Sequence, residues 1–149
     1  DLLFASGCEQ PMQASGAGKT DEIPLLVRFE DSCPKEVIET VAGCAIPPWA
    51  KDPSKPDEVP VCRKPNEKII WLAVTGASPP YQRDENLPFE IVFKKKEHDP
   101  IEKSRGGQCK DSHKGVLDCK IKGSAEQGTY YDYSVVAGEC SLDPRIYVP

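Results

Sequence analysis

The chain of 149 residues carries a net charge of −5 and contains 38% hydrophobic and 29% charged residues. This length and balance indicate one soluble, folded domain with room for a hydrophobic core. The acidic charge excludes the basic surface through which proteins bind nucleic acids. Fifteen prolines and eleven glycines argue against long helices and predict short elements joined by turns.

At the N-terminus, a short apolar run, Leu2-Leu3-Phe4, leads into Ala5-Ser6-Gly7-Cys8. This segment resembles the lipobox of bacterial lipoproteins, where small residues precede a cysteine that becomes the lipidated first residue. The resemblance implies cleavage after Gly7 and attachment to a lipid bilayer through Cys8. It departs from the family in having Ala5 where Leu is usual and in lacking a basic region before the box. Residues 1–7 are expected to be the remnant of a signal peptide or of added sequence.

The segment that follows Cys8 is polar and rich in small residues up to Glu22, with no hydrophobic period. Such a composition is typical of a flexible tether, so we expect residues 8–22 to join the membrane to a folded domain at 23–149. Glu9 is not the Asp that typically signals retention in the inner membrane. The resemblance therefore favours a periplasm-facing protein on the outer membrane over one on the inner membrane. The alternative is that Cys8 is an ordinary thiol on a disordered tail.

Beyond residue 23 the hydrophobic period is mostly two, which is typical of strands with one buried face. The segments concerned are 25–29, 68–74, 89–94, 116–122, 131–135 and 145–148. Residues 37–42 fit either a strand or one or two helical turns. We expect all-β structure, a Greek-key β-sandwich of about seven strands separated by Pro/Gly turns. Residues 47–65, with six prolines, and residues 97–114 are expected to be its long loops.

Part of this domain, residues 59–149, resembles the cupredoxin-like sandwiches. The matching motifs are an Ile-x-Trp strand (69–71), a Pro-Phe-x-Ile-x-Phe strand (88–93) and a closing Gly-Thr-Tyr-x-Tyr hairpin from Gly128, through Gly138 and 142–144, to Ile146 and Val148. The resemblance implies a cupredoxin/immunoglobulin-like sandwich.

In that family a type 1 copper site takes two His, a Cys thiolate and usually a Met. This sequence has no His after His113, and its only Met is Met12, in the expected tether. We therefore expect no copper site. His98 and His113 are interpreted as solvated loop histidines, and we expect no metal and no cofactor. No nucleophile elbow, metalloprotease helix motif or phosphate-binding loop is present, so the sequence does not indicate an enzyme.

Seven cysteines without a C-x-x-C spacing favour export to an oxidising compartment. With Cys8 set aside, an even number remains to form disulfides: Cys33, Cys44, Cys62, Cys109, Cys119 and Cys140. The sequence leaves their pairing open among all the connectivities that six cysteines allow. One hypothesis closes the short loops Cys109–Cys119 and Cys33–Cys44 and leaves Cys62–Cys140.

Trp49 follows Pro47-Pro48 and Tyr81 follows Pro79-Pro80, so both rings are expected on stiff loops. They are the candidates for partner binding, since a pre-ordered aromatic ring loses little entropy on contact. The alternative is that each ring caps one end of the core. The sequence as a whole favours a non-catalytic binding or assembly module of the bacterial cell envelope, with an envelope protein as partner. Two alternatives are a periplasmic inhibitor of a hydrolase and a metal-handling protein on a modified cupredoxin scaffold.

Overall fold

The regular structure of this chain is almost entirely β. The computed structural model describes residues 23–50, 60–102 and 109–149. Within them it has one short 3-10 helix, η2 (Pro48–Ala50), and ten strands: β1 (Leu25–Glu30), β2 (Cys33–Ile38), β3 (Val61–Cys62), β4 (Lys68–Thr75), β5 (Gln82–Arg83), β6 (Glu90–Phe93), β7 (Val116–Lys120), β8 (Thr129–Ala137), β9 (Cys140–Leu142) and β10 (Arg145–Val148). In the described part of the chain, no helix has the length and apolar character needed to span a membrane.

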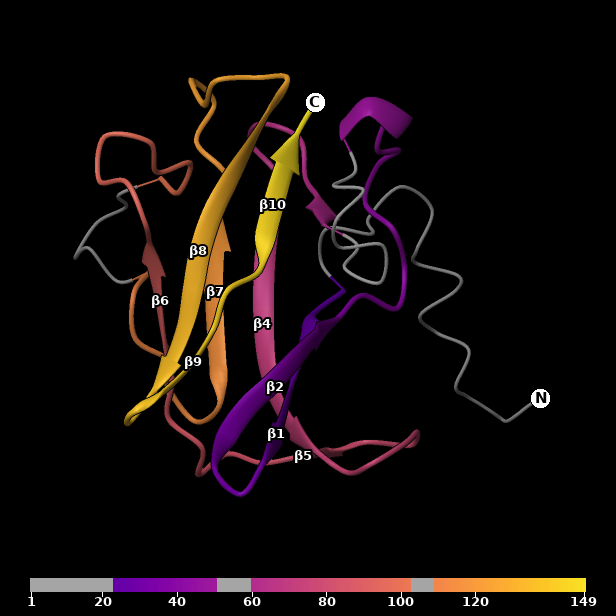
Figure 1. Ribbon diagram of the computed structural model, residues 1–149, viewed down its shortest axis with the longest axis vertical. Helices are drawn as coiled ribbons and strands as arrows, with labels where there is room; N and C mark the ends of the chain where they lie inside the picture. The colour runs from indigo at the N-terminus through magenta and orange to yellow at the C-terminus, as the bar shows by residue number, and fades with distance from the viewer. Residues whose placement is uncertain (1–22, 51–59, 103–108) are drawn as a thin grey trace.

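The strands form two mixed sheets. The first sheet has the strand order β2-β1-β4-β5, and β7 also pairs with β4. The second runs β3-β10-β8-β6, and β9 pairs with the end of β8. The pairs β1–β4 and β3–β10 are parallel and the others antiparallel. Figure 1 shows β8 and β10 of the second sheet lying in front of β4 and β7 of the first.

The core fills the space between these sheets because side chains alternate across each strand. In β4, Ile69 and Trp71 are buried, and in β8 Tyr131, Tyr133 and Val135 are buried. Each large apolar side chain removed from water contributes about 1.5–3 kcal/mol. These inward residues are those that the period of two predicted, so the expected all-β sandwich is confirmed.

Two aromatic residues link the sheets at the centre of the core. The indole N–H of Trp71 donates a hydrogen bond to the hydroxyl of Tyr133 over 3.1 Å, and the ring centroids lie 5.7 Å apart. Burial raises the pKa of the Tyr133 phenol well above its ordinary value, although the Trp71 hydrogen bond and the charge of Arg63 act in the opposite direction. The phenol therefore remains a neutral, hydrogen-bonded part of the core.

The connections cross repeatedly between the sheets, as expected for a Greek-key sandwich. One such crossing leads from β7 to β8 and is fixed by Tyr131, whose hydroxyl donates to the backbone carbonyl of Glu126 over 2.6 Å. A tyrosine that bonds back to the chain a few residues upstream is a tyrosine corner, a recurring device of such sandwiches.

The structure has more strands than the sequence predicted. Three of the additional strands, β3, β5 and β9, are only two or three residues long and too short for a period to be visible. The fourth, β2, was covered by a predicted segment only at its end. The ambiguous segment 37–42 is strand only at Val37 and Ile38, where β2 ends. The chain then leaves the first sheet and reaches the second at Cys44.

All six cysteines assigned to bridges are paired, but the pairing hypothesis was only partly right. Cys109–Cys119 is confirmed. The other two proposed pairs are wrong, because the structure joins Cys33 to Cys140 and Cys44 to Cys62. Cys8 lies outside the described residues, as do the expected leader and tether.

The error arose from assuming that neighbours in sequence close short loops. Strand β2 lies at the edge of its sheet and faces β9 of the other sheet, which brings the Cα atoms of Cys33 and Cys140 to 5.5 Å across a sequence separation of 107. A cross-link over a loop of that length restricts the unfolded chain most, by roughly 4–5 kcal/mol in the entropic account. This bridge therefore ties the first hairpin to the last.

Candidate functional site

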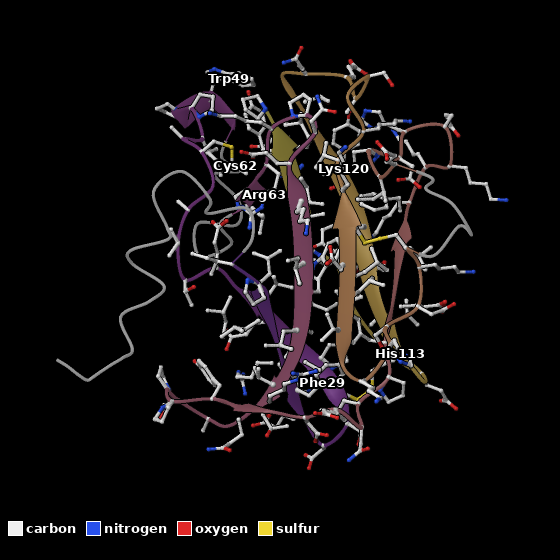
Figure 2. The ribbon with its side chains drawn as sticks, turned by 180° about the vertical axis from the view of Figure 1, so that it is seen from behind. Phe29, Trp49, Cys62, Arg63, His113 and Lys120 are labelled. Atoms are coloured by element: carbon white, nitrogen blue, oxygen red, sulfur yellow. A yellow bond between two sulfur atoms is a disulfide. The ribbon has the colours of Figure 1, made fainter. Side chains whose placement is uncertain are left out.

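Trp49 is the most exposed large hydrophobic side chain of the described residues, with 71% of its surface open to solvent. It lies in η2, directly after Pro47 and Pro48, whose rings limit the backbone. Its indole meets the ring of Tyr147 edge-on at 6.0 Å between centroids. Figure 2 shows Trp49 at one end of the sandwich, with Cys62 and Arg63 close below it. Trp49 is therefore an exposed ring directly after two prolines, and its role in partner binding stays a prediction.

The platform under Trp49 is a second, smaller hydrophobic cluster, separate from the main core. Its buried members are Cys62 and Tyr147, against which Cys44, Ile46 and Tyr130 pack. The Cys44–Cys62 disulfide joins the segment that carries Trp49 to β3. A covalent bridge and a fixed proline backbone together reduce the number of positions open to Trp49.

The aromatic contacts continue across the outer face of the second sheet. Tyr147 meets Tyr130 at 5.5 Å, and the guanidinium of Arg145 lies 4.2 Å above the Tyr130 ring. These residues lie on the face of the sheet opposite to the core residues Tyr131 and Ile146, because β10 and β8 pair Tyr147 with Tyr130 and Arg145 with Asp132. We call Trp49, Tyr147, Tyr130 and Arg145 the aromatic row. Within this row Trp49 is exposed, Tyr130 and Arg145 are partly exposed and Tyr147 is buried. The Arg145 cation is held by Asp132 at 3.0 Å.

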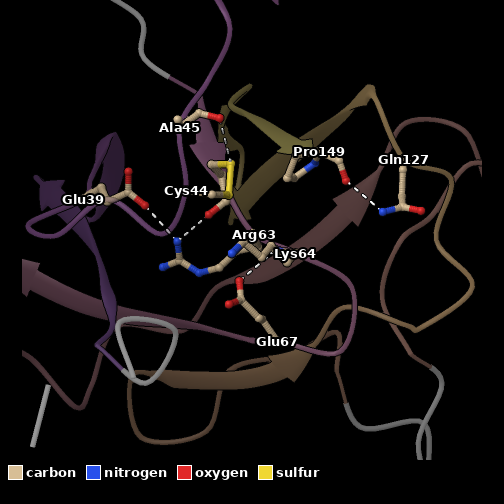
Figure 3. Close-up of a disulfide and its surroundings, with 9 residues drawn as sticks. Glu39, Cys44, Ala45, Arg63, Lys64, Glu67, Gln127 and Pro149 are labelled. Carbon is tan, nitrogen blue, oxygen red and sulfur yellow. Dashed lines mark hydrogen bonds and ion pairs between the residues drawn. A yellow bond between two sulfur atoms is a disulfide. The ribbon is translucent and has the colours of Figure 1, made fainter. Parts of the chain in front are cut away.

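Beneath this platform lies a buried ion pair. The side chain of Arg63 is 0% exposed and donates from Nη1 to Glu39 and to the carbonyl of Cys62, each over 2.8 Å (Figure 3). Gly43 must lack a side chain because a Cβ there would collide with the Cys62 carbonyl and the Arg63 guanidinium. The pair thus fastens the segment that runs from Glu39 to the disulfide at Cys44.

The second candidate, Tyr81, does not join this site. It lies in the turn after β4 and precedes β5, and the last residue of β4, Thr75, pairs with Phe29. Phe29 lies at the opposite end of the molecule from Trp49 (Figure 2). Tyr81 is also only partly exposed. The two candidate rings therefore lie at opposite ends of the sandwich, and partner binding by Tyr81 stays a prediction.

Sequence reasoning missed two arginines of this region. Arg63 follows a buried strand directly, and an apolar Val61-Cys62 pair before a charged residue was the available signal. Arg145 had no signal, because its position over Tyr130 depends on the register of β10 with β8.

A larger cavity, of about 430 Å³, opens beside β6 and the Cys109–Cys119 bridge. Ile91, Phe93 and Ile101 line its floor, and both positive and negative side chains stand at its rim. Glu102 and Cys109, where the described chain stops and resumes, also line it. Among the described residues, no three His, Cys, Asp or Glu side chains are grouped as metal ligands would be.

The sequence of this protein matches no protein-family model. It also matches none of the curated proteins at a significant level. What the protein binds is therefore inferred from its own residues.

Proposed function

We propose that this protein is an exported binding module of a bacterial cell envelope, tethered by a lipid on Cys8, which engages another envelope component through Trp49. The observation that carries this proposal is the 71% exposure of Trp49 on a platform fixed by prolines and a disulfide. Displaying a tryptophan to water is unfavourable by about 1.5–3 kcal/mol or more relative to burying it. Exposed aromatic rings on pre-ordered supports are typical anchors of binding surfaces.

The compartment is supported by the three disulfides. Such bridges persist in the periplasm and outside cells and are rare in a reducing cytosol. Attachment through Cys8 is supported by the lipobox-like sequence at its N-terminal side. Multiple acyl chains would anchor the protein stably, whereas one chain binds membranes only marginally.

The binding proposal is tested by replacing Trp49 with a benzophenone amino acid and irradiating cells that make the full, anchored protein. We expect a discrete adduct at position 49 and none at Gln82, an exposed residue of β5 at the opposite end. Excess wild-type protein should suppress the adduct, whereas excess Trp49→Ala should not. The Val92→Ala variant is the matched competitor, because Val92 is also an exposed apolar residue. Equal amounts of adduct at positions 49 and 82 would show that binding is not specific to the Trp49 surface and would contradict the proposal.

The anchor is tested independently by the intact mass of protein extracted from membranes. We expect the mass of Cys8–Pro149 with a diacylglyceryl group and a further acyl chain. Reduction should add two hydrogens for each of the three bridges. An unlipidated chain that retains Leu3 to Gly7 would contradict the anchor and leave the Trp49 proposal standing.

A further inference from the structure

A polar cavity of about 180 Å³ adjoins the aromatic row. It lies where the chain after β6 follows β8, held there by a backbone hydrogen bond from Lys94 to Asp132 over 3.0 Å. Its walls are Lys94, Lys95, His98, Thr129, Tyr130 and Asp132. Tyr130 is partly exposed and belongs both to this cavity and to the aromatic row, so the cavity borders the row.

The charges around the cavity favour an anion. Lys94 is paired with Asp143 at 3.3 Å and His98 with Glu126 at 3.5 Å, while the carboxylate of Asp132 is held by Arg145. Lys95 is exposed, and its ammonium group makes no ion pair or hydrogen bond within the part of the chain that the structure describes. An anionic group in the cavity would therefore gain Lys95 as a partner without displacing an internal acid.

The hydrogen-bonding groups around the cavity further limit the class of ligand that would fit. Around the cavity, lysine ammonium groups donate, the Asp132 carboxylate accepts, and the Thr129 hydroxyl does both. Such a mixture suits several hydroxyl groups at close spacing, whereas the energetic centre of a protein interface is apolar and dry. The exposed indole of Trp49 offers a flat surface to the C–H face of a sugar ring. Trp49 is reached from Tyr130 through Tyr147, by centroid steps of 5.5 Å and 6.0 Å.

From this juxtaposition we infer that the component bound is an acidic oligosaccharide, with a carboxylate or phosphate beside Lys95 and a sugar ring against Trp49. This inference rests on the proposed function and names the ligand class for the same surface. The Lys95 ammonium would recognise a carboxylate and a phosphate in the same way, and the probes described below distinguish the two groups.

The test uses the intrinsic fluorescence of the complete protein. Trp71 is fully buried, so a ligand on the surface changes the emission of Trp49 alone. The probes are trigalacturonate, a phosphorylated mannose oligosaccharide and neutral maltotriose. We expect saturable change with at least one acidic probe, weakened by added salt, and at least tenfold weaker binding of maltotriose.

Two lysine variants decide whether the site is specific. Lys95→Gln should weaken binding of the acidic probe about tenfold, the range expected for one hydrogen bond to a charged group. Lys35→Gln, at an exposed position of β2 in the other sheet, should leave it unchanged. Equal affinity for maltotriose, no saturable change with any probe, or equal effects of the two variants would overturn the inference. A position-49 crosslink to a protein alone would also overturn it while leaving the proposed function intact.

Discussion

The ion pair of Arg63 and Glu39 offers a sharp test of how the Trp49 platform is supported. Arg63 is completely buried, whereas the Glu39 side chain is 17% exposed, so water screens the carboxylate only in part. The Nε and Nη2 atoms of Arg63 have no hydrogen-bond acceptor in the described residues, and Nη1 carries both of its bonds. The compensation of this buried cation therefore depends mainly on Glu39.

The Glu39→Gln substitution keeps the shape of the side chain and removes its charge. Breaking a buried pair by neutralising one partner costs about 3–5 kcal/mol, and the partial exposure of Glu39 places our expectation near ~3 kcal/mol. With a urea m-value of roughly 2 kcal/mol/M, the unfolding midpoint should fall by about 1.5 M. A Glu39→Leu, Arg63→Met double variant should recover most of this loss, since it leaves no charge buried.

The measurement is equilibrium urea unfolding of the oxidised protein, followed by far-UV circular dichroism. The matched control is Glu36→Gln, which removes the partner of Arg28 at 2.6 Å on the surface, where Glu36 is 49% exposed. We expect at most about 1 kcal/mol there. A loss at Glu39 no larger than that at Glu36 would refute the reasoning and show that another group compensates Arg63.

Three further predictions concern the core and the platform. Tyr133→Phe should lower the free energy of unfolding by about 1–3 kcal/mol at neutral pH, because the Trp71 indole N–H loses its acceptor. Because burial raises the pKa of Tyr133, wild-type stability should fall as pH rises above about 10, by up to ~1.4 kcal/mol per pH unit from this residue. In urea titrations the variant should lose the part of this dependence that comes from Tyr133. Trp49→Phe should change stability by less than about 0.5 kcal/mol and should abolish acrylamide quenching of tryptophan emission, since the remaining indole is buried. Gly43→Ala should lower the urea midpoint by the equivalent of about 1–3 kcal/mol, because its Cβ collides with Arg63.

The long strands could be predicted because each shows an alternation of apolar and polar residues within its own sequence. Tyr131, Tyr133 and Val135 alternate with more exposed residues whichever strand they pair with, so the period alone identifies β8. Strand β3 has only two residues and shows no such alternation. It is a strand because Val61 and Cys62 pair with Ile146 and Tyr147, far away in the sequence. Such a pairing depends on the topology of the whole domain and cannot be predicted from the sequence of a single segment.

The same limit explains the mixed outcome for the site. The two prolines before Trp49 indicated a loop, whereas the sequence left open whether its ring would be exposed or would cap the core. Whether Tyr81 shares a surface with Trp49 depends on the end of the sandwich at which each loop lies, and no local sequence pattern contains that information. The prediction of the disulfide pairing was wrong for the same reason, because Cys140 lies near Cys33 only after both sheets have formed.

The location of the small hydrophobic cluster argues for binding over stability. Cys62 and Tyr147 belong to strands of the second sheet but pack on its outer side, apart from the core between the sheets. A sandwich needs only its inner faces to be apolar, and its outer faces are ordinarily polar. Here the outer cluster, a disulfide and a buried ion pair converge on a short segment whose tip, Trp49, is left in water. Stability alone would be served by covering that ring. Fixing it in place while leaving it exposed lowers the entropy lost on contact, which benefits the protein only when something binds there.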